Sequence, residues 1–103
     1  MLVSELLLRI GSLPSTHAAF LEDPIEWRAD KRAIVLDLEE LDDPDAEIVT
    51  SDGVEYIYAL QVATIEDVVA NATMQNPAAD QTTLLRAVEF YFDHDAFLEI
   101  ETG

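Results

Sequence analysis

The stretch SDGVEYIYALQV, residues 51–62, gives the clearest structural signal in this chain. Its first three residues, Ser51-Asp52-Gly53, predict a tight turn, because Asp and Gly tolerate the backbone angles that turns require. The apolar side chains that follow alternate along the chain, which places on one face of a β-strand Val54, Tyr56, Tyr58, Leu60 and Val62. Ile57 and Ala59 make the opposite face partly apolar too. The pattern therefore predicts a central strand over residues 54–62.

Three further segments have strand-like patterns. Residues 33–38, AIVLDL, form a near-continuous apolar run, which is typical of a strand buried on both faces. Residues 17–21 give a weaker strand signal and lead into a turn at Glu22-Asp23-Pro24. Residues 97–101 alternate and predict a final strand.

A short helix is expected at the start of the chain, over residues 5–11. Ser4 is a suitable N-cap for it, and Gly11 is a typical stop signal. Its buried stripe would consist of Leu6, Leu7 and Ile10.

Two longer helices are expected over residues 65–75 and 81–93. Thr64 is the predicted cap of the first helix, and Asp80 or Thr82 caps the second. The inward residues of the first are Ile65, Val68, Val69 and Ala72. The second has an apolar stripe of Leu84, Leu85, Val88, Tyr91 and Phe92.

The order of these elements predicts an α+β fold in a single domain over residues 1–103. We expect an antiparallel or mixed sheet of about four or five strands, with the two C-terminal helices packed on it and a short N-terminal helix beside them. The chain has no cysteine, which excludes disulfides and thiolate sites and fits a cytoplasmic protein.

Charge is distributed very unevenly along the chain. It carries 22 acidic and 5 basic side chains, for a formal charge of -17. Residues 1–32 are almost neutral, so nearly all of the excess lies in residues 33–103. Repulsion between like charges opposes compaction, and a basic partner would relieve it. Half of the residues are hydrophobic, so the chain is not a disordered acidic tail.

The same composition argues against several classes of partner. Nucleic-acid phosphates require basic side chains for binding, so we expect no nucleic-acid partner. No apolar stretch approaches the roughly 20 residues of a membrane span, so we expect no membrane partner.

The acidic segment, residues 37–55, is the strongest candidate site. Its nine carboxylates are Asp37, Glu39, Glu40, Asp42, Asp43, Asp45, Glu47, Asp52 and Glu55. Two interpretations remain open: a solvated stretch that aids solubility, or a docking surface for a basic partner. The alternate carboxylates of residues 43–47 also suggest calcium, but an EF-hand loop needs a Gly at position six and a Glu at position twelve, both missing here. We therefore expect no metal and no cofactor.

Phe90 is the second candidate in this site. On the predicted helix it lies about 150° from the centre of the apolar stripe, beside Arg86, Glu89 and Asp93. Either the tail from Phe97 onward covers it, or it is an exposed aromatic anchor for a partner. Trp27, between Glu26 and Arg28, invites the same two interpretations.

No catalytic constellation is evident. Asp93-His94-Asp95 is interpreted as the polar end of a helix, where a His is favourable near the negative end of the helix dipole. His17 has no partner nearby in the sequence. We expect no catalytic residues and no enzymatic activity.

Three stretches together support a resemblance: AIVLDLEELDDPD (33–45), YALQVATIEDVVANATMQNP (58–77) and LLRAVEFYFDHDAFLEI (84–100). They resemble an uncharacterised family of small acidic bacterial proteins that are similar to immunity proteins of polymorphic or contact-dependent toxin systems. The resemblance implies a toxin inhibitor whose acidic surface occupies the basic cleft of a cognate toxin, for example a nuclease.

The leading hypothesis is thus a non-catalytic binding protein, monomeric or weakly dimeric, with a basic toxin domain as its partner. The alternative is a small self-associating regulatory or scaffold domain whose acidity serves solubility only. A third hypothesis, an enzyme or acidic metal site, would use carboxylates such as Asp93 and Asp95.

Overall fold

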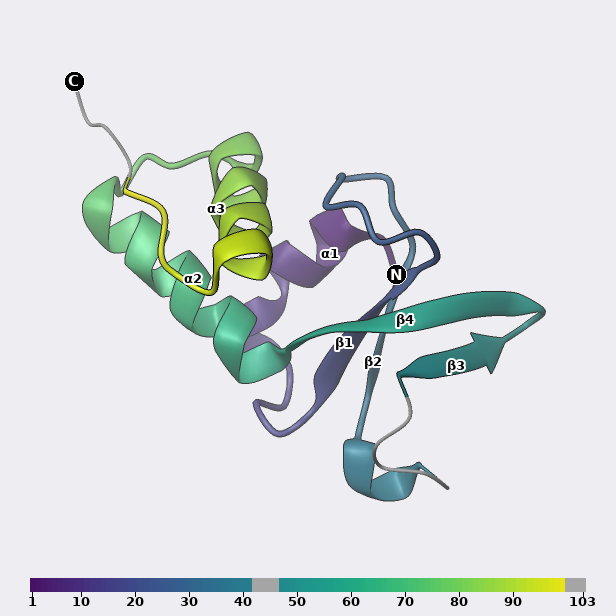
Figure 1. Ribbon diagram of the computed structural model, residues 1–103. Helices are drawn as coiled ribbons and strands as arrows, with labels where there is room; N and C mark the ends of the chain where they lie inside the picture. Colours follow the sequence, from purple (N-terminus) through teal and green to yellow (C-terminus); the bar gives the residue numbers. More distant parts are fainter. Residues whose placement is uncertain (42–46, 100–103) are drawn as a thin grey trace.

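A four-stranded antiparallel sheet forms the centre of the structure, with the helices gathered on one of its faces (Figure 1). The computed structural model describes residues 1–41 and 47–99. The strands are β1 (Ala18–Glu22), β2 (Ala33–Leu36), β3 (Ile48–Ser51) and β4 (Val54–Gln61), in the spatial order β2-β1-β4-β3. The α-helices are α1 (Val3–Leu8), α2 (Val62–Gln75) and α3 (Gln81–His94), and two single-turn 3₁₀ helices are η1 (Ile10–Ser12) and η2 (Leu38–Glu40). The predicted α+β fold is confirmed.

The hairpin of β3 and β4 closes through a two-residue turn. Ser51 pairs with Val54, so Asp52 and Gly53 alone connect the strands. Both have positive φ, 52° and 77° respectively. An Asp-Gly pair with two positive φ angles is the turn that best matches the twist of paired strands. The predicted turn is confirmed, and local residue chemistry explains it.

The central strands differ in part from the expectation. β4 lies between β1 and β3, as predicted, but β2 is an edge strand rather than a strand buried on both faces. Only Ala33 in β2 is fully buried. The most buried strand is β1, in which residues 18–21 have no exposed surface. An apolar run predicts a strand, but which strands flank it is decided by long-range pairing.

A bulge in β4 changes which side chains share a face. Ala19 pairs with Leu60 and Phe20 with Tyr58, which leaves Ala59 as an extra residue. Tyr58 therefore packs with Phe20 on the outer face, whereas Ala59 and Leu60 both join the helix-side core. The prediction that Leu60 and Val62 share the face of Tyr56 is wrong, and Val62 is in fact the first residue of α2.

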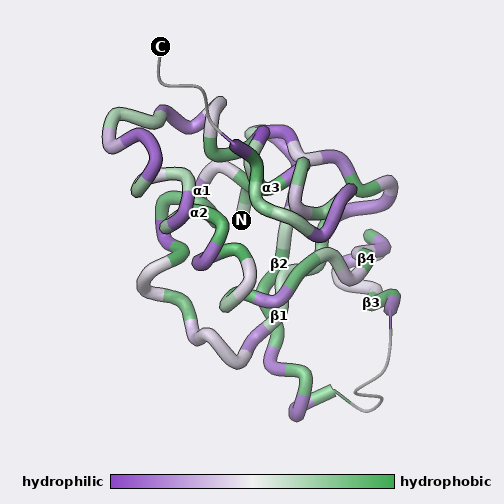
Figure 2. Tube along the Cα trace, turned by 60° about the vertical axis from the view of Figure 1, so that its left-hand side comes forward, coloured by the Kyte–Doolittle hydropathy of each residue, from purple (hydrophilic) through white to green (hydrophobic). Residues whose placement is uncertain are grey.

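Two hydrophobic clusters lie on opposite faces of the sheet. The larger one joins the sheet to the helices, and its fully buried members include Val3, Leu6, Leu21, Val62, Ile65, Val68 and Val88. The smaller one, on the outer face, centres on Ala18, Phe20 and Tyr56. The two leucines that flank the acidic residues of η2, Leu38 and Leu41, pack against it. Figure 2 shows this alternation of hydrophobic and hydrophilic segments just before the grey trace.

The helix starts differ in two of three cases from the prediction. α1 begins at Val3 rather than residue 5; Leu2 is its N-cap, and the Glu5 carboxylate accepts a hydrogen bond from the Leu2 N–H at 3.2 Å. Ser4 thus lies inside the helix. α2 follows β4 directly, with Gln61 as N-cap and no side-chain cap, so Thr64 lies in its first turn. The last residue of β4 is also the N-cap of α2, so the strand continues directly into the helix without a capping side chain.

The third helix starts as predicted. Asp80 is the N-cap of α3, and its Oδ1 accepts hydrogen bonds from the backbone N–H and the hydroxyl of Thr83, both at 2.9 Å. The bond from the backbone N–H, followed by that from the hydroxyl, lowers the pKa of Asp80 below its ordinary value.

The C-terminal end departs from prediction. Residues 97–99 form no strand and instead fold back on the helices, and the rest of the predicted strand lies outside the described residues. The Phe97 ring packs on Tyr91 at 5.5 Å, and the Leu98 carbonyl accepts a hydrogen bond of 2.9 Å from Gln75. Within α3, Ala87 and Val88 are buried, but Phe92 is 37% exposed rather than part of the buried stripe. No helix in the described part of the chain is long and apolar enough to cross a membrane.

Replacing Gly53 with Ala tests the hairpin turn. We expect Gly53→Ala to lower the free energy of unfolding by about 1–2 kcal/mol, because a Cβ disfavours the left-handed conformation. Urea denaturation measures the change. Gly11→Ala is the matched control, because Gly11 also has open space around it but no positive φ. Equal effects of the two substitutions would contradict a conformational role for Gly53.

The cap of α3 should give a defined pH dependence. Because the folded pKa of Asp80 is lowered, its ionised cap stabilises the fold fully above the unfolded pKa and loses this effect as pH falls through the folded pKa. We expect Asp80→Ala to lower the melting temperature at neutral pH, and the deficit to shrink below about pH 4. Asp80→Asn, which keeps an acceptor without ionising, should lose less at neutral pH. Thermal melts monitored by circular dichroism measure this, and a deficit that grows in acid would contradict it.

Candidate functional site

The first part of the acidic segment follows the edge strand β2. The Asp37 carboxylate accepts a hydrogen bond from the backbone N–H of Glu39 at 3.0 Å, and one of its oxygens lies 3.8 Å from Nε2 of His17. Glu39 and Glu40 are exposed on η2. Asp37 thus shapes the start of η2, while the two glutamates project charge into solvent. Three further predicted residues, Asp42, Asp43 and Asp45, lie outside the described residues.

The second part of the segment belongs to the β3–β4 hairpin. Asp52 is exposed in the turn, and Glu55 is exposed on β4, opposite Thr50. Glu47, at the start of β3, is exposed as well, and its backbone carbonyl accepts a hydrogen bond from Tyr58 at 2.8 Å.

The carboxylates of η2 and those near the hairpin turn lie toward opposite ends of the sheet, and Glu47 lies between them, beside Tyr58. β2 ends at Leu36, which pairs with Ala18, and Ala18 also pairs with Gln61 at the end of β4. Glu55 lies six residues before Gln61, or roughly 20 Å along the strand. The described carboxylates are therefore spread along the sheet instead of forming one compact patch.

Few cations neutralise this charge. Within residues 1–41 and 47–99, ion pairs shorter than 4 Å join His17 to Asp37, at 3.8 Å, and Arg28 to Glu26 and Asp30, at 3.2 and 3.7 Å. The other described carboxylates have no basic group within that distance. Their mutual repulsion is therefore relieved mainly by solvent and counter-ions.

Partly exposed apolar side chains lie on the outer face of the sheet. The outer cluster contributes the half-buried side chains Ile34, Leu36, Val49, Val54 and Tyr58. Ile48 of β3, 57% exposed, points to the opposite face of the sheet, because it pairs with Ile57 and alternates with Val49. Burial raises the pKa of the Tyr58 hydroxyl, so it stays neutral at physiological pH. A partly exposed apolar centre with a charged rim is the anatomy of many protein–protein interfaces.

Phe90 is not part of this surface. It lies on α3, half-buried, with its ring 4.4 Å from that of His94. It lines a hollow of about 230 Å³ with Arg86, Glu89, Asp93, His94 and Leu98. The tail does cover this side of the helix, since Leu98 lines the same hollow. Phe90 was predicted to act together with the acidic segment. In the structure it lies on α3, apart from that segment.

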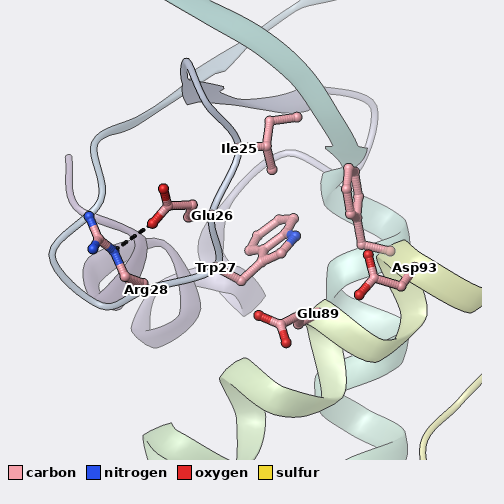
Figure 3. Close-up of a pocket in the computed structure, with 7 residues that line it drawn as sticks. Ile25, Glu26, Trp27, Arg28, Glu89 and Asp93 are labelled. Atoms are coloured by element: carbon pink, nitrogen blue, oxygen red, sulfur yellow. Dashed lines mark ion pairs between the residues drawn. The ribbon is translucent and has the colours of Figure 1, made fainter.

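A second hollow, the Trp27 cleft, lies between α3 and the loop that precedes β2 (Figure 3). Its volume is about 410 Å³, and its lining residues are Ile25, Glu26, Trp27, Arg28, Glu89, Phe92 and Asp93. Trp27 is 94% buried, and its ring meets that of Phe92 edge to face at 5.8 Å. Backbone hydrogen bonds from Ser4 to Ala29 (3.1 Å) and from Val3 to Lys31 (2.8 Å) fix the loop against α1.

Trp27 is a candidate anchor on sequence grounds, but the cleft is not predictable from the sequence. The contact with Phe92 spans 65 positions, and the helical stripe assigned Phe92 to the core. The signal in the sequence was the pair of carboxylates Glu89 and Asp93, four residues apart on one side of the predicted helix.

The described residues contain no group of three or more His, Asp or Glu side chains arranged to hold a metal ion. Asp93-His94-Asp95 instead terminates α3. Asp95 adopts the left-handed conformation, with φ of 54°, and its N–H donates to the Tyr91 carbonyl at 2.7 Å. Burial, followed by the charge of Asp95, raises the pKa of Tyr91.

The fold and these surfaces define a small, strongly acidic α+β domain. The chain belongs to the family described as Domain of unknown function (DUF7716), whose model matches residues 1–100. Neither the curated proteins nor the solved structures contain a match to this chain.

The unpaired charge should make folding stability depend on salt. We expect the melting temperature at pH 7 to rise by roughly 5 °C or more between about 20 mM and about 500 mM NaCl, because salt screens repulsion between carboxylates. At about pH 4, where many carboxylates are protonated, the rise should be smaller. A melting temperature that is insensitive to salt at pH 7 would show that the repulsion is already compensated within the fold.

Proposed function

We propose that this protein is a non-catalytic binding protein that docks on the basic surface of a partner protein. The observation that carries the proposal is the scarcity of internal charge compensation. Of the carboxylates described in the segment, only Asp37 has a basic group within 4 Å, and that group is a histidine. A basic partner would supply the missing opposite charge.

The outer sheet face supports this proposal through its shape. The half-buried side chains around Tyr58 offer apolar contact area. The carboxylates at both ends of the sheet would steer a basic surface onto this area and fix its orientation. Complementary charge of this kind raises association rates far more than it raises affinity.

The specific role that we propose is that of an immunity protein, a toxin inhibitor in bacterial toxin systems. It rests on the resemblance of residues 33–45, 58–77 and 84–100 to such proteins. The outer sheet face would cover the basic cleft of a cognate toxin, for example a nuclease, and exclude its substrate by occupancy. No residue of this chain would take part in chemistry, and the inhibitor would act in the cytoplasm.

Charge-neutralising pairs test this proposal, with a toxin domain from a reading frame next to the gene as the partner to be sought first. We expect Glu39→Gln with Glu40→Gln, and separately Asp42→Asn with Asp43→Asn, to lower the association rate at least about threefold at low salt. Surface plasmon resonance at several salt concentrations measures this, and the wild-type rate should fall as salt rises.

The matched control is Glu66→Gln with Asp67→Asn, which removes the same charge from exposed positions on α2. An equal effect of the control would mean that net charge alone matters. Association that ignores both salt and the segment variants would rule out docking by the acidic segment.

A self-associating domain is the second candidate, and one observation favours it. β3 is an edge strand that carries Ile48, 57% exposed, so two copies have an edge available for pairing. Light scattering at high salt, where repulsion is screened, distinguishes the two: a tight dimer that Ile48→Lys abolishes would support self-association.

A further inference from the structure

We propose that the Trp27 cleft is a binding site for an arginine side chain presented by a protein partner. The guanidinium would lie between the aromatic rings of the cleft and the carboxylates of α3, and the main-chain carbonyl of the same segment would accept the indole N–H of Trp27. This site lies on the helix layer, away from the acidic segment. Binding at the cleft is independent of binding by that segment.

The first observation is a buried donor without an acceptor. The indole Nε1 of Trp27 is completely buried and has no hydrogen-bond partner in the described part of the chain. Buried tryptophan N–H groups usually have an acceptor, and an unpaired one destabilises the fold. Figure 3 shows this nitrogen on the side of the ring that faces Asp93, at the wall of the cleft. An acceptor that enters the cleft would satisfy it.

The second observation is a pair of like charges on one helix face. Glu89 and Asp93 are four residues apart on α3, so they lie on the same face, and both are exposed. No basic group of the described residues lies within 4 Å of either, because Arg28, the cation of the cleft, pairs with Glu26 and Asp30. Asp93 also lies in the last turn of the helix, where the dipole disfavours negative charge. A bound cation would relieve both penalties.

The third observation is the composition of the walls. Trp27 and Phe92 offer ring surfaces beside the carboxylates, and a cation over an aromatic face is attracted to it. A guanidinium is planar, stacks on rings and bonds a carboxylate with two parallel N–H groups, which a lysine ammonium does not. The cleft should therefore prefer arginine to lysine. Phosphates and carboxylates would be repelled by Glu26, Glu89 and Asp93.

Binding requires a small local movement. The indole nitrogen is covered in the free structure, and the Phe92 ring, 37% exposed, packs against the Trp27 ring. A rotation of Phe92 would open the N–H to the carbonyl of the ligand. The loop that carries Trp27 would stay in place, because its backbone is hydrogen-bonded to α1.

Trp27 is the only tryptophan of the chain, so its indole N–H gives a single resolvable signal in a ¹H–¹⁵N spectrum. The probe is the peptide acetyl-Gly-Arg-Gly-amide at low salt, with lysine and citrulline versions for comparison. We expect a saturable downfield shift of the indole proton with the arginine peptide, a weaker response with lysine and none with citrulline, which lacks the charge. Glu89→Gln with Asp93→Asn should weaken arginine binding at least about tenfold.

Three results would overturn the proposal. One is the lack of any saturable shift with the arginine peptide, and another is equal binding of the citrulline peptide. The third is an upfield indole shift in free Asp93→Asn, which would show that Asp93 already accepts the N–H in solution. The control pairs Glu66→Gln with Asp67→Asn and Glu39→Gln with Glu40→Gln should leave peptide binding unchanged, so a failure here is separate from a failure of docking by the acidic segment.

Discussion

Burial of β1 is the constraint on which the rest of the structure depends. Its four residues from Ala18 to Leu21 have no exposed surface, and they alternate between the two hydrophobic clusters. Ala19 and Leu21 face the helices, whereas Ala18 and Phe20 face outward under Tyr56 and Tyr58. Because β1 pairs with both β2 and β4, its register fixes where each neighbour begins. The bulge in β4 shifts the register between Ala19 and Phe20, so Ala59 and Leu60 both belong to the helix-side cluster, two residues before α2 begins.

The free energy gained by burying β1 has to outweigh the repulsion within a chain of net charge -17. The fold accommodates the charge by keeping carboxylates at strand ends, in turns and on the outer helix faces, where solvent and counter-ions screen them. A few carboxylates also have local structural roles: Glu5 accepts a bond from the Leu2 N–H, Asp37 shapes η2, and Asp80 caps α3. The repulsion that remains is a free-energy term that any basic partner lowers when it binds. Binding to the native state then stabilises the fold as well as the complex.

The parts of the fold that local chemistry determines were predictable from the sequence. The Asp52-Gly53 turn, the Asp80 cap and the α+β order follow from residues within a few positions of one another. Long-range pairing decides the rest. The apolar run of β2 resembles a central strand, yet β1, with two small alanines, is the strand that both faces cover. The bulge at Ala59 has no clear sequence signature, because it depends on the register of the opposing strand.

The candidate sites show the same division between local and long-range information. Because the acidic residues are close in sequence, they predicted one patch. In the sheet, the described carboxylates of this segment are instead spread along the strands. The Trp27 cleft is the converse case, since it joins residues 27 and 92 that no local pattern connects. Asp93 opposes the dipole of α3, and the indole donor has no acceptor among the described residues, so two local rules are broken at one place. Natural sequences concentrate such violations where function requires them. This coincidence, more than the total charge, is the reason for proposing a recognition site at the cleft.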